Sequence, residues 1–221
     1  MKHIRLWLHG YTKSSARAAA KCLESSQTLQ TIDLLYGTNY QHLPAVISPL
    51  LRALSRNASV TKLCVDTDIV GVASVAFQEL LTCTQTLQNL EFTGLEAFDE
   101  VQLAAIASGF ANNTTLRFVE FQSWREAALT PMLTALQCHP ALEKIHIFDD
   151  YYGLDHLPSL SGLEVLLRSH DSKVKELFLA QVDTRTVGLH SVLRELERNN
   201  TVTNLAIRDS ALSREIVQQV K

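Results

Sequence analysis

The sequence predicts an α/β solenoid built from stacked strand–helix units. Three observations predict it: a six-residue apolar motif recurs along the 221 residues, each motif ends in the alternation of a strand, and a stretch of helical periodicity follows each motif. Such a unit cannot bury both of its apolar faces alone, so neighbouring units must cover them. We therefore expect one horseshoe-shaped domain over residues 1–221, with a parallel sheet on its concave face and helices on its convex face.

The recurring motif reads apolar, two residues, apolar, one residue, apolar, and it predicts eight strands. A degenerate copy, His3-x-x-Leu6-x-Leu8, opens the chain, and Val202-x-x-Leu205-x-Ile207 is the last copy. Successive central residues are 26 to 32 residues apart, a regularity that chance does not produce eight times. The predicted strands are centred near residues 6, 32, 63, 90, 119, 145, 177 and 205.

Helical periodicity occupies the intervals between the motifs and predicts one helix after each strand. Three of the helix-to-strand joints carry Asn followed by Ser or Thr, at Asn57, Asn112-Asn113 and Asn199. Asn tolerates the left-handed backbone that closes many helices, so we interpret these residues as helix stops rather than as glycosylation sites. The predicted helical stretches are residues 16–23, 46–54, 75–81, 103–110, 129–136, 160–167, 187–196 and 212–220.

This pattern resembles the leucine-rich repeat family, in its ribonuclease-inhibitor-like class of long repeats with full helices. The resemblance covers essentially the whole chain. The family places an Asn or Cys three residues after the last strand position, where it forms a ladder along the backbone. The chain departs from that pattern and is a divergent member, because the corresponding residues are Gly37, Asp68, Leu95, Trp124, Asp150, Val182 and Ser210.

The composition excludes several classes of protein. With 46% hydrophobic residues and only 8 Gly and 5 Pro, the chain is too apolar for a disordered tail. A net charge of −3 without a run of Lys and Arg gives no reason to expect a nucleic-acid partner. No apolar run reaches the roughly 20 residues of a membrane span, and the N-terminus lacks a secretory leader, so we expect a cytoplasmic or nuclear protein without a membrane partner.

A search for chemistry finds no catalytic, metal-binding or cofactor-binding pattern. The chain has no glycine-rich phosphate loop, no G-x-S-x-G and no H-E-x-x-H, and its eight histidines are scattered. None of the cysteines forms a C-x-x-C pair, and the repeat spacing keeps Cys83 and Cys138 too far apart for a disulfide. We expect buried or half-buried free thiols at Cys22, Cys64, Cys83 and Cys138.

The repeat register shows which side chains share the concave face, because alternate residues of a strand point to opposite sides. One column holds Trp7, Asp33, Cys64, Glu91, Glu120, His146, Phe178 and Ala206. The next column holds His9, Leu35, Asp66, Thr93, Gln122, Phe148, Ala180 and Arg208. An acidic run therefore crosses the middle repeats, formed by Asp33, Asp66, Glu91 and Glu120. Aromatic residues gather beside it, and Tyr151 and Tyr152 stand on the following loop.

We predict that this region binds a partner protein with a basic and apolar contact patch. Aromatic anchors dominate protein interfaces, and an acidic run steers basic partners. Two structural alternatives stay open: Phe118 and Phe178 staple neighbouring strands, and the acidic run is only a solvated face. The predicted partner-binding residues are Asp66, Glu91, Phe118, Glu120, Trp124, His146, Phe148, Tyr151, Tyr152 and Phe178.

The resemblance implies a non-catalytic module for protein–protein interaction. Two other functions occur on the same repeats: activation of a small GTPase, and the repeat arm of a larger receptor or ubiquitin-ligase subunit. The ends of the array leave further alternatives, since the chain starts in a strand bearing Trp7 and stops in the predicted helix 212–220 without a separate polar cap. The terminal helix caps the array, or the chain is a piece of a larger protein, or the edges self-associate.

Overall fold

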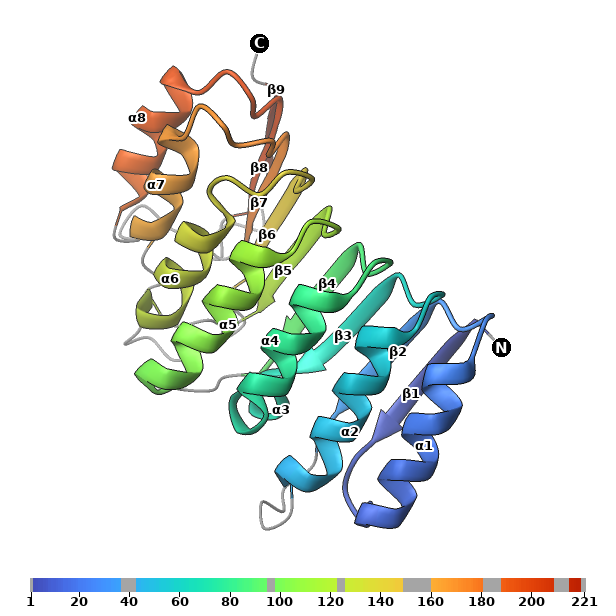
Figure 1. Cartoon of the computed structure of the whole chain (residues 1–221). Helices are drawn as coiled ribbons and strands as arrows, with labels where there is room; N and C mark the ends of the chain where they lie inside the picture. Colours follow the sequence, from blue (N-terminus) through green and yellow to red (C-terminus); the bar gives the residue numbers. More distant parts are fainter. Residues whose placement is uncertain are drawn as a thin grey trace. The chain divides into compact units, whose positions relative to one another are not determined.

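The computed structural model describes residues 2–36, 43–94, 98–122, 126–148, 160–180, 188–208 and 215–219. The chain divides into two compact units, Met1–Leu116 and Arg117–Lys221, and each is described by itself. Strands and helices alternate along the chain in both units, as Figure 1 shows. The strand–helix units predicted from the sequence are therefore present.

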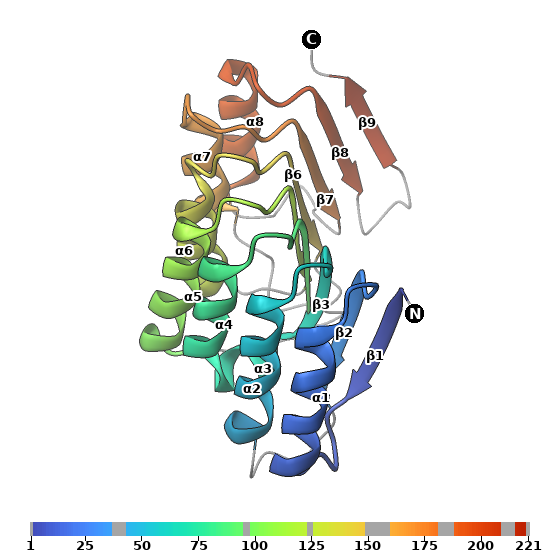
Figure 2. The ribbon, with the colours of Figure 1, turned by 45° about the vertical axis from the view of Figure 1, so that its right-hand side comes forward.

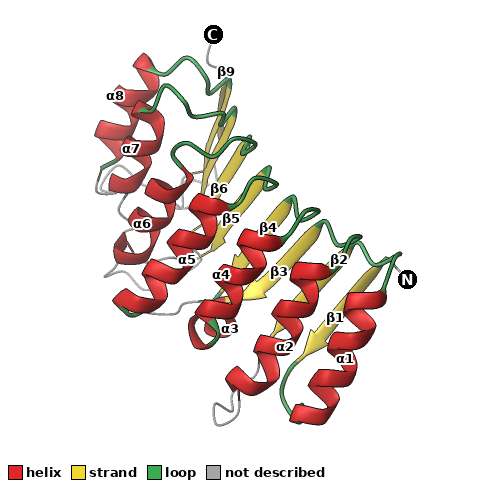
Figure 3. Ribbon diagram, in the orientation of Figure 1, coloured by secondary structure: helices red, strands yellow, loops and turns green. Residues whose placement is uncertain are grey.

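The first unit has four parallel strands in sequential order, each followed by helix on one face of the sheet (Figure 3). The strands are β1 (His3–Trp7), β2 (Thr31–Leu35), β3 (Lys62–Asp66) and β4 (Asn89–Thr93). The helices are α1 (Lys13–Ser25), α2 (Leu43–Arg56), α3 (Thr67–Val72), α4 (Ser74–Cys83) and α5 (Glu100–Asn112). Of these, α1, α2, α4 and α5 pack side by side.

The second unit repeats this arrangement and ends differently. Its parallel strands are β5 (Phe118–Gln122), β6 (Lys144–Phe148), β7 (Glu176–Ala180) and β8 (Asn204–Arg208), and its helices are α6 (Glu126–Leu136), α7 (Ser161–Arg168) and α8 (Leu189–Arg198). A last strand, β9 (Glu215–Gln219), pairs antiparallel with β8.

The helix predicted over residues 212–220 is therefore wrong for its central part, because residues 215–219 form β9. The β-branched pair Ile216-Val217 favours a strand. A strand also satisfies the backbone groups at the edge of β8, which a helix cannot do.

Alternation along the strands separates a buried face from an open face. On β3 the side chains of Leu63 and Val65 are buried, while Lys62, Cys64 and Asp66 are partly exposed. Behind the first sheet, Phe92 packs edge-to-face between Phe77 and Phe110, with ring centroids 5.8 and 6.1 Å away. This pattern is the period-two signal that predicted the strands.

Within each unit the strand register agrees with the prediction, except in the first repeat. Ile32, Leu63 and Leu90 align across the first unit, and Val119, Ile145, Leu177 and Leu205 align across the second. In β1, however, Ile4 rather than Leu6 pairs with Ile32, so the predicted register of this strand is off by two residues. The alternation Ile4-x-Leu6-x-Leu8 fits both registers, and only the observed one places Arg5 beside Asp33.

The Asn residues at the joints end helices, but not through a left-handed backbone. Asn113 and Asn199 have φ of −77°, with ψ of 143° and 134°, which is extended. Their side chains instead reach the preceding repeat: Asn113 Nδ2 donates to the carbonyl of Leu81 at 2.6 Å, and Asn199 Nδ2 donates to that of Leu167 at 2.7 Å. Asn57 does the same to Leu23 at 2.6 Å.

The oxygen of each of these Asn side chains also organises the turn into the next strand. Asn57 Oδ1 accepts from the amides of Ser59 and Val60 at 2.8 and 2.7 Å. These Asn side chains therefore form a polar ladder, which is located before β3, β5 and β8 rather than after the strands. His139 occupies the same position before β6; it is 4% exposed, and its Nδ1 accepts from the amide of Ala141 at 3.3 Å.

The cysteines are less buried than predicted. Cys22, Cys83 and Cys138 are exposed, and Cys64 is half-buried; all four are free thiols. Cys22 and Cys83 lie on the solvent side of α1 and at the end of α4, outside the apolar stripes that face the sheet. Free Cys residues are often buried, but the position of Cys22 and Cys83 around their helices exposes them.

Candidate functional site

The open face of the second unit carries three of the six aromatic site residues predicted from the sequence, Phe118, Phe148 and Phe178. Helices α6, α7 and α8 lie on one side of its strands (Figure 2), and no described helix covers the other side. Alternate side chains of β5 to β8 project there in three rows. The rows are Phe118, Lys144, Glu176 and Asn204; Glu120, His146, Phe178 and Ala206; and Gln122, Phe148, Ala180 and Arg208.

Three phenylalanines surround His146 at the centre of this face. The centroid of its ring lies 4.7 Å from that of Phe118, 5.2 Å from that of Phe178 and 6.0 Å from that of Phe148. Phe148 and Phe178 also contact each other, at 5.1 Å. The three phenylalanines are partly exposed, and the side chain of His146 is 23% exposed. The structure thus brings together four predicted site residues from three strands, which we call the Phe face.

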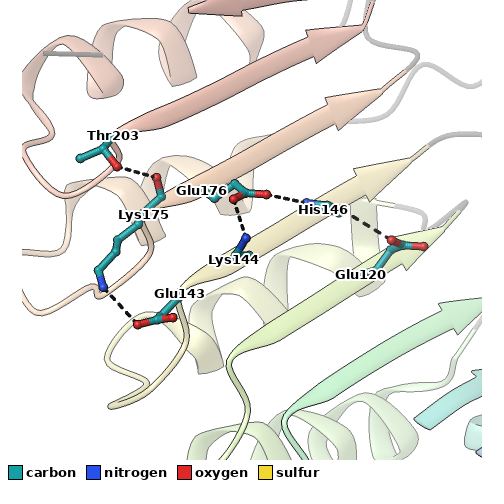
Figure 4. Close-up of polar contacts among 7 residues, drawn as sticks. All are labelled: Glu120, Glu143, Lys144, His146, Lys175, Glu176 and Thr203. Carbon is teal, nitrogen blue, oxygen red and sulfur yellow. Dashed lines mark hydrogen bonds and ion pairs between the residues drawn. The ribbon is translucent and has the colours of Figure 1, made fainter. Parts of the chain in front are cut away.

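A carboxylate lies at each ring nitrogen of His146. Its Nδ1 is 3.6 Å from Oε2 of Glu120, and its Nε2 is 3.3 Å from Oε1 of Glu176 (Figure 4). Glu120 also accepts a hydrogen bond from Gln122 Nε2 at 2.7 Å. These contacts fix the plane of the imidazole, which stands edge-on to the phenyl rings of Phe118 and Phe148 and is tilted against that of Phe178.

Ion pairs run between neighbouring strands beside the Phe face. Lys144 Nζ lies 2.7 Å from Glu176 Oε2, and its hydrogen bond lowers the pKa of Glu176 below the ordinary value. One step before the strands, Lys175 donates to Glu143 at 3.1 Å and lowers the pKa of that carboxyl in the same way (Figure 4). Glu143 and Glu176 are therefore ionised and paired with lysines at neutral pH.

The acidic run divides between the two units, and the first unit pairs most of it with cations. Asp33 is buried between Arg5, at 2.9 Å, and His3, at 3.1 Å. Glu91 lies 2.6 Å from Lys62. Asp66 caps α3 by accepting from the amide of Asp68 at 3.2 Å, and burial raises the pKa of its carboxyl.

The two columns predicted from the sequence left out a third row of the open face, which contains Lys62 and Lys144. Lys62, Lys144 and Glu176 stand one residue before the strand centres, on the same open face. The alternation that gave the other two columns also gives this third one. The remaining predicted residues Trp124, Tyr151 and Tyr152 lie outside the described residues.

The described residues do not form a metal site or a membrane-spanning helix. Among the described residues, no group of three or more His, Cys, Asp or Glu side chains could hold a metal ion. In the same part of the chain, every helix is too short or too polar to cross a membrane. The chain matches no protein-family model, and no curated protein matches its sequence.

Proposed function

We propose that the chain is a leucine-rich-repeat solenoid that binds a partner protein on the Phe face and catalyses no reaction. The observation that carries this proposal is the packing of three partly exposed phenylalanines around His146, on a side of the sheet that no described helix covers. Partly exposed aromatic rings with fixed neighbours are typical of the residues that contribute most to protein interfaces. The parallel strand–helix units, repeated every 26 to 32 residues, support the assignment to these repeats.

The charges around the Phe face indicate an apolar contact at its centre. Glu176 already pairs with Lys144, and Glu120 and Glu176 both face His146. A basic group on the partner would compete with Lys144 and with the ring of His146 for these carboxylates, so its net contribution would be small. The partner should therefore present an apolar side chain to Phe148 and Phe178, with basic groups only at the rim.

The double substitution Phe148→Ser and Phe178→Ser tests the proposal. The partner is first captured from a lysate of the source organism, purified, and then titrated against the wild type and the variant by calorimetry. Loss of two aromatic anchors should weaken binding by more than about 100-fold, because each anchor contributes about 2 kcal/mol when truncated. Circular dichroism should be unchanged, since both rings project from the open face rather than into the core.

A matched control replaces two exposed apolar residues on the helical side of the same unit. Val165 on α7 and Leu193 on α8 are each 37% exposed, so their substitution by Ser removes similar side-chain chemistry away from the Phe face. This control should bind the partner as the wild type does. Equal affinities for the wild type and the Phe148/Phe178 variant would contradict the proposal.

A further inference from the structure

The solvent side of α1 carries three cations in one ridge. Lys13, Arg17 and Lys21 follow one another at intervals of four residues, and all three are exposed. This spacing places them on one side of the helix, about 6 Å apart along its axis. The buried stripe of α1, formed by Ala16, Ala20 and Leu23, lies about a quarter turn away around the helix. We call these three cations the α1 ridge.

The α1 ridge has no carboxylate partner within 4 Å among the described residues, unlike the cations of the neighbouring helix. Arg52 of α2 lies 2.8 Å from Glu79, and Arg56 lies 3.7 Å from Glu24. Glu24, the one acidic residue of α1, stands three residues after Lys21 on the same side of the helix, and it also lies 3.7 Å from Arg56. The ridge therefore keeps most of its positive charge.

The placement of these cations opposes the stability of α1. Like charges four residues apart repel each other on a helix. The first turn of α1 contains no acidic residue and begins with Lys13, and its last turn contains no basic residue, which is the reverse of what the helix dipole favours. An arrangement that breaks local rules of stability without a visible structural gain is typical of a functional surface.

The α1 ridge also lies in the positive half of an unevenly charged unit. Residues 1–62 contain eight Lys and Arg and two Asp and Glu, whereas residues 63–116 contain seven Asp and Glu and no Lys or Arg. No run of consecutive basic residues marks this distribution, because the cations are spread over whole repeats. Charges of one sign concentrated in this way attract ligands of the opposite sign.

We propose that the α1 ridge binds an acidic segment of a partner protein. Alternate side chains of an extended peptide are about 6.6 Å apart, close to the spacing of the three cations, so Asp or Glu at every second position would meet each in turn. The ridge is on the helical side of the first unit, so this inference does not depend on the Phe face.

The side chains between the three cations argue against two other polyanions. Only Ser and Ala stand at residues 14–16 and 18–20. Single-stranded nucleic acid needs aromatic rings on which its bases stack, and none is present. An anionic membrane is bound by about four to eight cations or by bulky apolar side chains that insert, and α1 provides neither.

The test uses the full chain and a fluorescein-labelled octaglutamate peptide, with fluorescence anisotropy at about 50 mM salt, where exposed ion pairs are weakly screened. The wild type should bind the peptide, and the triple variant Lys13→Gln, Arg17→Gln and Lys21→Gln should bind roughly tenfold more weakly. The control triple variant Lys173→Gln, Arg194→Gln and Arg198→Gln removes the same number of exposed cations from the second unit. It should bind the peptide within about twofold of the wild type.

Several outcomes would overturn the proposal. One is no binding of octaglutamate by the wild type, and another is equal loss in the two triple variants, which would indicate an effect of net charge alone. Tighter binding of oligouridine or of phosphatidylserine-containing vesicles than of the peptide would assign the ridge to a different ligand. Concentration-dependent self-association that only the α1 variant abolishes would identify a second copy of the chain as the occupant.

Discussion

His139 stands six residues before the centre of β6, at the position held by Asn57, Asn113 and Asn199 in other repeats. Burial lowers the pKa of its imidazole from 6.5 to about 4, so the folded protein holds it neutral. The unfolded chain therefore binds more protons between these two values. The free energy of unfolding should fall as the pH drops from 6.5 towards 4, by up to about 3 kcal/mol from this residue.

The variant His139→Asn separates this contribution from those of other groups. An Asn side chain there can accept from the same turn amides as Asn57 does, without titrating. Urea unfolding at pH 7.5, 6 and 5 should show a smaller loss of stability in the variant than in the wild type. The same loss in both proteins would mean that His139 does not control the acid sensitivity.

For single residues, the sequence identified important positions correctly but did not predict the interactions that these residues make. It singled out the Asn of three joints, yet attributed their role to backbone handedness. The hydrogen bonds of Asn57 to Leu23 and Asn113 to Leu81 join residues more than 30 positions apart. Local sequence does not contain such contacts, which follow only from the stacking of repeats.

Gly94, directly after β4, lies close to the residues where β3 ends and α3 begins. Gly94 has φ of +101°, and a Cβ there would lie 2.9 Å from both Asp66 Oδ1 and Thr67 Oγ1. The substitution Gly94→Ala adds a collision to the strain of a positive φ. We expect it to lower the free energy of unfolding by about 2 to 4 kcal/mol, as measured by urea denaturation.

Gly10 provides the control for this prediction. Its φ is +79°, but a Cβ there would meet nothing within 4 Å. Gly10→Ala should therefore cost only the strain of the left-handed backbone, about 1 kcal/mol. Equal losses in the two variants would show that the contact with Asp66 and Thr67 contributes nothing.

The elements themselves were largely predictable, with two exceptions. Seven helices and eight strands follow the periodicities of the sequence. The short helix α3 was missed because six residues are too few to display a helical period, and β9 was assigned to a helix. Both exceptions depend on neighbours: α3 starts where Asp66 caps it, and β9 exists because β8 offers an edge.

Each unit has its own buried core, which leads to a prediction for the whole molecule. Phe92 is fully buried in the first unit and Met132 in the second. In repeat arrays, stability is set mainly by each repeat and its nearest neighbours. Phe92→Ala, which should cost about 3 to 5 kcal/mol, should therefore speed amide hydrogen exchange in β2 to β4 more than in β6 to β8.

The reciprocal substitution is the control. Met132→Ala, costing about 2 to 5 kcal/mol, should speed exchange in β6 to β8 more than in β2 to β4. Uniform acceleration across all strands in both variants would show instead that the chain opens as one cooperative body.

The candidate site was predictable in position but not in charge balance. The register alone placed Phe118, His146, Phe148 and Phe178 on one face, and the structure brings their rings together. The acidic run looked unopposed because the prediction considered two rows of the face. The pairing of lysines with carboxylates depends on how far each side chain reaches across neighbouring strands, and the sequence does not specify this.

The Asn ladder has a consequence for how the chain is made on the ribosome. Asn57, Asn113 and Asn199 all donate backwards, to carbonyls of a repeat that has already been synthesised. Each of these Asn side chains can therefore make its hydrogen bond as soon as its own repeat docks, without waiting for later sequence. Folding can thus advance from the N-terminus at the pace of translation, and partly made chains expose little beyond their newest repeat.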